Sequence, residues 1–428
     1  MPPGNPDDRL PSTASGAARA PPSHTHRRGD CMEPFRQIGA RLRAAAFGAA
    51  IAAIAPPGLA QATQGVTDTE IVIGTHQDLS GPVAALGGPL RDGMVLAVED
   101  INAAGGIHGR KLRLVIEDSA FDPKKAVLAT QKLLTQDKVF AMVAPLGSAP
   151  TQATMPLILE RGVPLLFAGT PADFTYTPFH KLKFALSSPY GEQVRAQVKW
   201  AYEKLGKRRF GILYQDDETG QNVLRAAEEQ LKVHGLGLVE RASYKRGAID
   251  YSSQIARLKS ANVDVIILGT IVRETAAARM EARKQGWPVD MIVNVAGTNS
   301  AVFTIAGAEV MEGLYGQSQF LPLDSAEQPP AARGVIERYK ARFGKNPEDG
   351  IIFGYTSVML FAEGAKNAGR DLNVDSLVKG LEKIRNWTTA FAASPVSFSE
   401  TERLGVRATM VMQAKGGKFV PITPPITY

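Results

Sequence analysis

The chain has 428 residues, of which 44% are hydrophobic and 21% charged, a globular composition with enough length for two or three hydrophobic cores. Its 49 Lys and Arg against 42 Asp and Glu residues give a formal net charge of +7, with no long basic block. This balance argues against nucleic acid as a partner. The six histidines form no HExxH motif and no i, i+4 pair, so we expect no metal site.

The first 62 residues have the features of an export signal. Residues 1–31 are rich in Pro, Ala, Ser and Gly without periodicity, which indicates a disordered leader or a segment upstream of a true start at Met32. Residues 32–62 combine a basic stretch, an apolar run (Ala44–Ala55) and small residues, which is typical of a signal peptide cleaved near Ala62. The run would span about 18 Å, too short for a bilayer core of about 30 Å. We therefore expect a periplasmic protein.

From residue 70 onward, short β-branched runs alternate with longer helical patterns. Strands are predicted at 70–75, 111–118, 140–146, 164–169, 209–214, 237–244, 263–269, 290–295, 395–398 and 408–412. Helices are predicted at 88–103, 123–136, 150–161, 192–205, 220–233, 251–260, 273–285, 350–366 and 374–384. Continuous apolar strands separated by helices predict parallel sheets covered on both faces. The pattern restarts near residue 190, so we expect two lobes.

Polar residues follow several of these strands. In open parallel sheets, ligands bind beyond the carboxyl ends of the strands, where helix N-termini present free N–H groups. Ser148 and Thr170 lie in two such loops of the first lobe, and hydroxyl and N–H groups there suit a small carboxylate. Glu274 lies at a strand end of the second lobe. Two alternatives stay open: each hydroxyl could be a helix N-cap, and Glu274 could be a surface residue that stabilises a helix dipole.

Motifs for catalysis are missing from the sequence. It contains no GxGxxG after a strand, no GxxxxGK[ST] and no GxSxG. We therefore expect a binding protein, with neither enzymatic activity nor a cofactor.

Four stretches resemble a known family. These are DLSGPVAALGGPLRDGMVLAVEDINAAGGIHGRKLRLVIEDSAFDPKKAV (Asp78–Val127), VAPLGSAPTQATMPLI, DYSSQIARLKSANVDVIILG and GYTSVMLFAEGAKNAG. They are similar to the Leu/Ile/Val-binding protein family, the extracytoplasmic receptors of ABC importers. The resemblance implies an α/β fold of two doubly wound parallel-sheet lobes joined by a three-strand hinge, the type I periplasmic binding protein fold. The implied lobe 1 comprises 66–187 and 298–408, and lobe 2 comprises 188–297 and 409–428.

The resemblance also implies ligand-binding positions. Ser148 falls where the family holds the ligand's carboxylate, and Ala168 and Thr170 fall where a backbone group and a hydroxyl complete that grip. Glu274 falls where an acid of the other lobe meets the ligand's ammonium group.

The expected side-chain pocket departs from the leucine-type receptors. Leu86 stands where they carry an aromatic residue, and Thr219 stands where they carry a tyrosine. We expect Tyr190 to add apolar contact when the lobes close. Smaller walls at these positions imply room for a ligand that is larger or differently shaped.

The resemblance implies a receptor that captures a small amino acid, branched-chain or related, between its lobes and delivers it to the membrane subunits of an ABC permease. One alternative is a receptor for an aromatic carboxylate or amide. Another is a ligand-sensing module coupled to a chemoreceptor. We expect a monomer whose partners are the small-molecule ligand and the permease.

Overall fold

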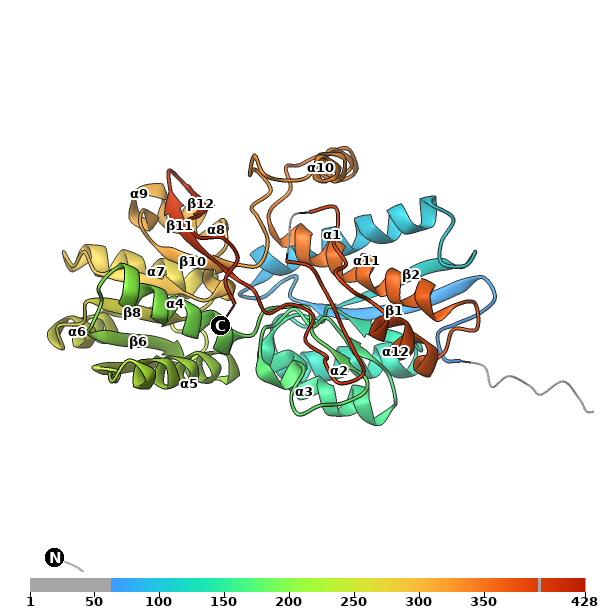
Figure 1. The fold of residues 1–428 in the computed structure, drawn as a ribbon, viewed down its shortest axis with the longest axis horizontal. Coiled ribbons are helices and arrows are strands. Elements are labelled where there is room, and N and C mark those ends of the chain that lie inside the picture. The colour runs from blue at the N-terminus through green and yellow to red at the C-terminus, as the bar shows by residue number, and fades with distance from the viewer. Residues whose placement is uncertain (1–62, 392–393, 428) are drawn as a thin grey trace, which may run out of the picture. The chain divides into compact units, whose positions relative to one another are not determined.

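The structure, a computed structural model, describes residues 63–391 and 394–427, so the predicted leader and signal peptide lie outside the described residues. Figure 1 labels most of the elements. In chain order they are β1 (Glu70–Gln77), α1 (Ala84–Ala103), β2 (Lys111–Asp118), α2 (Pro123–Thr135), β3 (Ala141–Val143), α3 (Ser148–Glu160), β4 (Leu165–Leu166), η1 (Asp173–Thr175), β5 (Lys183–Phe184), α4 (Tyr190–Lys204), β6 (Phe210–Gln215), α5 (Glu218–Val233), β7 (Glu240–Tyr244), α6 (Ser252–Ser260), β8 (Val265–Gly269), α7 (Val272–Lys284), β9 (Asp290–Val293), η2 (Val295–Gly297), α8 (Ala301–Ala306), α9 (Ala308–Met311), β10 (Tyr315–Ser318), α10 (Pro330–Phe343), α11 (Gly350–Ala368), α12 (Val374–Glu382), β11 (Met410–Lys415) and β12 (Lys418–Pro421). No helix of this described part combines the length and the apolar run that crossing a bilayer requires.

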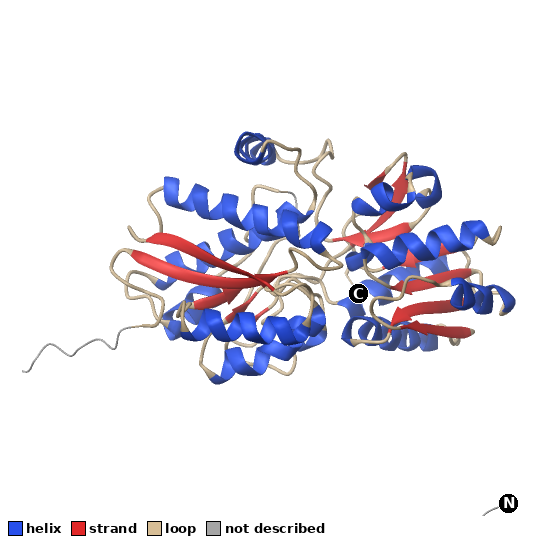
Figure 2. Cartoon of the chain, turned by 180° about the vertical axis from the view of Figure 1, so that it is seen from behind, coloured by secondary structure: helices blue, strands red, loops and turns tan. Residues whose placement is uncertain are grey.

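The described residues form two sheets, with helices on the faces of each (Figure 2). The first has the order β2-β1-β3-β4-β5 and is parallel throughout. The second has the order β12-β11-β10-β9-β8-β6-β7. It is parallel from β7 to β10, and β11 and β12 extend it as antiparallel strands. The prediction of two wound α/β lobes is confirmed, and the antiparallel edge is an addition that we did not predict.

Side chains alternate between two cores along each central strand. In β1, Ile71 and Ile73 belong to the core under α1 and α11, whereas Val72 belongs to the core under α2 and α3. In β8, Ile266 belongs to one core of the second sheet and Ile267 belongs to the core on its opposite face. Successive residues of a strand point to opposite faces, so an uninterrupted apolar run marks a strand that is buried on both sides.

Three connecting segments join the two lobes and lie side by side. The first runs from β5 to α4, the second follows β10, and the third precedes β11. Ser188 in the first segment donates its backbone N–H to Gln319 Oε1 at 2.8 Å and its hydroxyl to the carbonyl of Arg407 at 2.9 Å. Thr409 in the third donates to the carbonyl of Ser318 at 3.4 Å. These bonds tie the three segments into the hinge that the fold class implies.

Two predictions about the later part of the chain were wrong. The implied boundary assigned 298–408 to the first lobe, but β10 pairs with β9 and β11 in the second sheet. The predicted strand at 395–398 is absent from the described residues there, where Val396 forms only an isolated antiparallel bridge with Trp387. Both errors have the same reason: short strands take their place from their neighbours rather than from their own pattern. The remaining lobe boundaries stay predictions.

Helices α1 and α11 approach each other closely at glycines. A Cβ atom on Gly354 would lie 2.0 Å from the carbonyl oxygen of Leu90, and one on Gly93 would lie 2.3 Å from that of Ile351. Neither distance leaves room for a side chain, so the backbones touch at these points. The contact holds the first turns of α1 and α11 beside each other.

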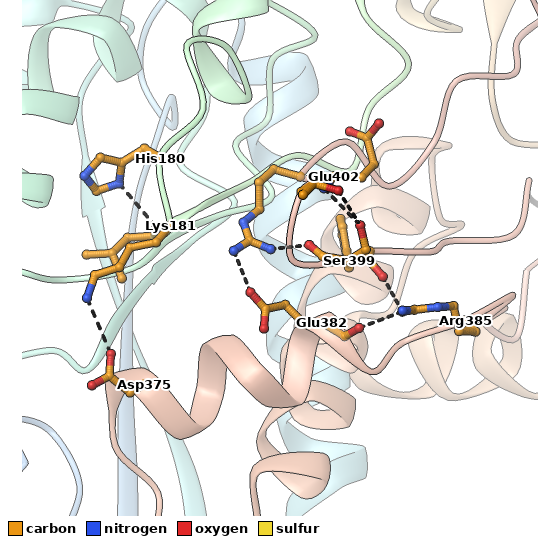
Figure 3. A network of polar contacts seen from close by, with 11 residues as sticks. His180, Lys181, Asp375, Glu382, Arg385, Ser399 and Glu402 are labelled. Atoms are coloured by element: carbon orange, nitrogen blue, oxygen red, sulfur yellow. Dashed lines mark hydrogen bonds and ion pairs between the residues drawn. The ribbon is translucent and has the colours of Figure 1, made fainter.

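A polar network anchors the third connecting segment to α12 (Figure 3). Arg403, which is only 3% exposed, donates to Glu382 Oε1 at 2.6 Å, and its guanidinium lies 4.4 Å from the centre of the Phe184 ring. Arg385 donates to the carbonyl of Glu382 at 2.6 Å. A buried charge needs such partners, because an unpaired one would be strongly destabilising. The network therefore has a structural role in the first lobe.

Candidate functional site

Hydroxyl groups from both lobes meet at one place. Ser148 Oγ lies 2.6 Å from Thr170 Oγ1, and the Thr219 hydroxyl donates to Ser148 Oγ at 3.0 Å. The hydroxyl of Tyr190 lies beside these three, since interactions with each of them lower its pKa. Each of these four residues is at most 3% exposed. We refer to Ser148, Thr170, Tyr190 and Thr219 as the hydroxyl cluster.

Local backbone geometry brings the first two hydroxyls together. Gly147 has a φ of +97°, and a Cβ atom there would lie 2.4 Å from the Phe121 ring, so only glycine fits. Gly147, rather than Ser148, is the N-cap of α3, and Ser148 makes no capping bond. The Thr170 hydroxyl accepts the N–H of Ala172 at 3.2 Å, and Ala172 directly precedes the short helix η1, which begins at Asp173. The capping alternative therefore does not account for the Ser148 hydroxyl.

Asp217 positions the contribution of the second lobe. It is the N-cap of α5, and its Oδ1 accepts the N–H of Thr219 at 3.0 Å. Its other oxygen forms an ion pair with Arg246 at 2.6 Å. Arg246 also donates to the carbonyl of Phe121 in the first lobe at 2.9 Å, and its guanidinium lies 4.8 Å from the centre of the Phe121 ring. The lobes are thus joined by this contact as well as by Thr219.

The cluster is neutral and rich in donors. Burial raises the pKa of Tyr190 to about 12, and its bonds to the other hydroxyls only partly oppose that rise. Tyr190 therefore keeps its proton at neutral pH. Hydroxyl groups can turn their hydrogens toward an incoming oxygen, so the cluster can donate several bonds to a carboxylate. His76 does not activate Ser148: its ring lies 3.4 Å from Thr154 Oγ1, and burial lowers its pKa to about 4.

Glu274 is a buried acid of the second lobe, in the first turn of α7. It is 5% exposed, and its Oε2 has no hydrogen-bond partner among the described residues. Burial raises the pKa of its carboxyl, and the charge of Asp217 raises it further, whereas its own backbone N–H, Arg273 and Arg246 lower it. The hydroxyl of Tyr244, whose pKa responds to the charge of Glu274, is likewise unpartnered. Glu274 is therefore no exposed surface residue.

An apolar cavity adjoins Tyr190. Its volume is about 150 Å³, and it is partly open to solvent. Its wall includes Leu86 and Leu90 of α1, Phe320 of the second connecting segment and Phe353 of α11. Leu86 thus lies on the wall of a cavity, and its contact with a ligand stays a prediction.

The structure brings four of the seven predicted residues into the hydroxyl cluster, places Leu86 and Ala168 next to it and leaves Glu274 without a hydrogen bond to it. Ser148, Thr170, Tyr190 and Thr219 form the hydroxyl cluster, and Leu86 lines the adjoining cavity together with Tyr190. Ala168 is buried next to Thr170, and its carbonyl accepts the N–H of Thr170 at 2.7 Å. No hydrogen bond in the described part of the chain joins Glu274 to the cluster; Asp217 lies near both, since its charge acts on Glu274 and on Tyr190.

Sequence reasoning missed several residues of this region. Asp217 lies in a predicted strand-end loop and follows the same rule as Ser148, so it could have been singled out. Arg246 follows the predicted strand at 237–244, so the same rule could have found it. Phe320, Asp349 and Phe353 could not be found in this way, because none of them follows a strand that the sequence predicts.

Comparison with known proteins agrees with this two-lobed ligand-binding architecture. Residues 70–418 match the sequence family described as periplasmic binding protein. Leu/Ile/Val-binding protein homolog 7 of Brucella abortus is 26% identical over 378 residues, which cover 85% of this chain and 94% of the relative. The Leu/Ile/Val/Thr-binding protein of Salmonella typhimurium is 26% identical over 303 residues, covering 71% of this chain and 81% of the relative.

Solved structures share the fold at lower identity. The substrate binding protein LivJ of a branched-chain amino acid transporter from Streptococcus pneumoniae, in complex with isoleucine, gives a TM-score of 0.74 at 24% identity, covering 84% of this chain and 100% of that chain. A fatty acid ABC transporter substrate-binding protein from Thermomonospora curvata gives 0.78 at 23% identity, covering 86% and 94%.

The fold and the clustered site define a two-lobed α/β binding protein. The chain belongs to the periplasmic binding protein family, and its relatives include Leu/Ile/Val-binding proteins.

Proposed function

We propose that this chain is an extracytoplasmic substrate-binding protein of an ABC importer. It captures a small amino acid, branched-chain or related, between its lobes and delivers it to a membrane permease, which is its protein partner. It acts as a periplasmic monomer and releases its ligand chemically unchanged. The observation that carries the proposal is the hydroxyl cluster, in which Ser148 and Thr170 of one lobe meet Thr219 of the other beside an apolar cavity.

When the ligand binds, the hydroxyls donate to its carboxylate instead of to one another. It docks first on Ser148 and Thr170, with the backbone at Ala168 supporting the loop, and Thr219 reaches it when the lobes close. Glu274, with its unpartnered oxygen, takes the ligand's ammonium group. One such charged hydrogen bond in a desolvated site contributes about 1.5–3 kcal/mol. That energy shifts an open–closed equilibrium about 10- to 150-fold.

A second candidate ligand is an aromatic carboxylate or amide. The wall of the apolar cavity favours it, because that wall carries two aromatic side chains. Phe320 and Phe353 in its wall would pack against an aromatic ring. The two candidates share the carboxylate grip and differ in what the cavity holds.

A thermal-shift screen of the purified chain tests the proposal. The panel comprises branched-chain and other amino acids, aromatic carboxylates and amides. A ligand at a hundredfold excess over its dissociation constant stabilises the folded state by about 2.7 kcal/mol, so a true ligand raises the melting temperature by several degrees. Recovery of the hit unchanged after incubation separates binding from turnover. If no compound of these classes stabilises the chain, the proposal is wrong.

A further inference from the structure

The wall of the cavity beside Tyr190 contains one acidic residue. Its lining comes from the start of α1, the second connecting segment, the loop after β9 and the start of α11, and it is largely apolar. Tyr190 stays neutral because its pKa is about 12, so Asp349 is the one other lining residue whose side chain can carry a charge. A single acid in an apolar wall is costly unless something compensates it. The question is therefore what meets this carboxylate.

Only one of the two carboxylate oxygens of Asp349 has a hydrogen-bond partner in the described part of the chain. Its Oδ1 accepts the backbone N–H of Leu323 at 3.0 Å. Asp349 stands at the N-cap position of α11, but its side chain makes no capping bond. The structure gives its Oδ2 no hydrogen bond or ion pair within the described residues. Lys345, the nearest lysine in sequence, is paired with Asp92 at 2.9 Å.

Asp349 is half-buried, and its carboxylate can accept a further donor. Burial raises the pKa of Asp349, the charge of Asp324 raises it further, and only the N–H of Leu323 lowers it. A ligand nitrogen or hydroxyl that donates to Oδ2 would supply the missing partner, whether the donor is cationic or neutral. Glu274 cannot serve the same part of the ligand, because it does not line the cavity.

We propose that Asp349 is a specificity-determining residue that selects amino acids whose side chain places a hydrogen-bond donor within an otherwise apolar body. The apolar part packs against Leu86 and Phe353, and the donor group reaches Asp349 Oδ2. This inference rests on the proposed function, because it assumes that an amino acid occupies the site. Asp349 would recognise the ligand's side chain, whereas the hydroxyl cluster binds its carboxylate.

Two pairs of ligands of matched shape test it, because the members of each pair differ only in the donor. Ornithine carries an ammonium where norleucine has a methyl group, and tyrosine carries a hydroxyl where 4-methylphenylalanine has a methyl group. Isothermal titration on the wild-type chain should show the donor member of at least one pair binding about tenfold or more tightly than its methyl counterpart.

Asp349→Asn removes the charge and keeps an oxygen that can accept the N–H of Leu323. This variant should lose the preference within the pair and bind the methyl member as well as the wild type does. Asp324→Asn is the matched control: it removes an acid from the neighbouring segment whose side chain is 58% exposed and paired with Lys418, so it should keep the preference. If Asp349→Asn does not fold, Asp349→Ser, which also retains an acceptor, takes its place.

The outcomes distinguish the two proposals. If the wild type prefers the methyl member of both pairs, or Asp349→Asn keeps the preference, the role of Asp349 is refuted while the proposed function stands. If Asp349→Asn is merely less stable with an unchanged preference, the residue is structural and the inference is again wrong. If neither pair nor any compound of the thermal-shift panel binds the wild type, both proposals fail.

Discussion

Removing the hydroxyl at the centre of the cluster is the most direct test of the site. Ser148 lies 2.6 Å from Thr170 Oγ1 and accepts from Thr219 at 3.0 Å, so Ser148→Ala deletes bonds within one lobe and between lobes. A neutral hydrogen bond contributes about 0.5–1.5 kcal/mol. The remaining hydroxyls can turn toward each other, so we expect a loss of stability of about 1–2 kcal/mol.

The effect on ligand binding should be larger than the effect on stability. A hydrogen bond to a carboxylate in a desolvated site contributes about 1.5–3 kcal/mol, which corresponds to a roughly 10- to 150-fold rise in dissociation constant. Because Thr170 and Thr219 survive in the variant, we expect a value near the lower end. Isothermal titration with the best ligand from the screen measures the first quantity, and thermal unfolding without ligand measures the second.

A control on the same helix separates binding from stability. Thr154 of α3 is fully buried, and its hydroxyl donates to the carbonyl of Thr151 at 3.1 Å and lies 3.4 Å from His76 Nε2. Thr154→Val should therefore cost a similar amount of stability and leave the dissociation constant unchanged. Were Ser148→Ala to bind its ligand as tightly as Thr154→Val, the hydroxyl cluster could not be the carboxylate site.

Two further predictions follow from the structure. Burial raises the pKa of Glu274 above its ordinary value of 4.5, so the folded state holds this proton more tightly than the unfolded state and loses stability as pH rises through the folded pKa. Glu274→Gln should therefore become more stable than the wild type as pH rises above about 4.5, by on the order of 1 kcal/mol at neutral pH. Its affinity for ligands with an ammonium group should fall. The prediction is contradicted if the difference in melting temperature between the variant and the wild type stays constant from pH 4 to pH 8. Gly354→Ala forces a Cβ atom to within 2.0 Å of the Leu90 carbonyl oxygen, so we expect the variant to be destabilised by at least about 1–3 kcal/mol, as measured by denaturant unfolding. Gly344→Ala cannot serve as the control, because Gly344 has a φ of +65° and the substitution would itself strain the backbone. Gly334→Ala in α10, which is helical and meets only the flexible end of Arg338, should be tolerated.

The alternation of strands and helices could be predicted from the sequence because it is a local property. Strand β2 has its predicted bounds, and α2 and α7 differ from theirs by one residue at one or both ends. Periodic burial and β-branched runs are visible in any short window of the chain. The same holds for the hydroxyls at strand ends, since parallel strands bring their carboxyl ends to one edge.

Tertiary structure decided what each of these residues meets. Ser148 and Glu274 could have been a cap and a surface acid by local pattern, and only their burial and their partners exclude those roles. The place of β10 depended on β9 and β11 rather than on its own four residues. The cavity wall joins Leu86 to Phe353 because glycines let α1 and α11 touch. Contacts between segments so distant in the chain leave no periodic trace in either segment, which is why local sequence could not reveal Asp349.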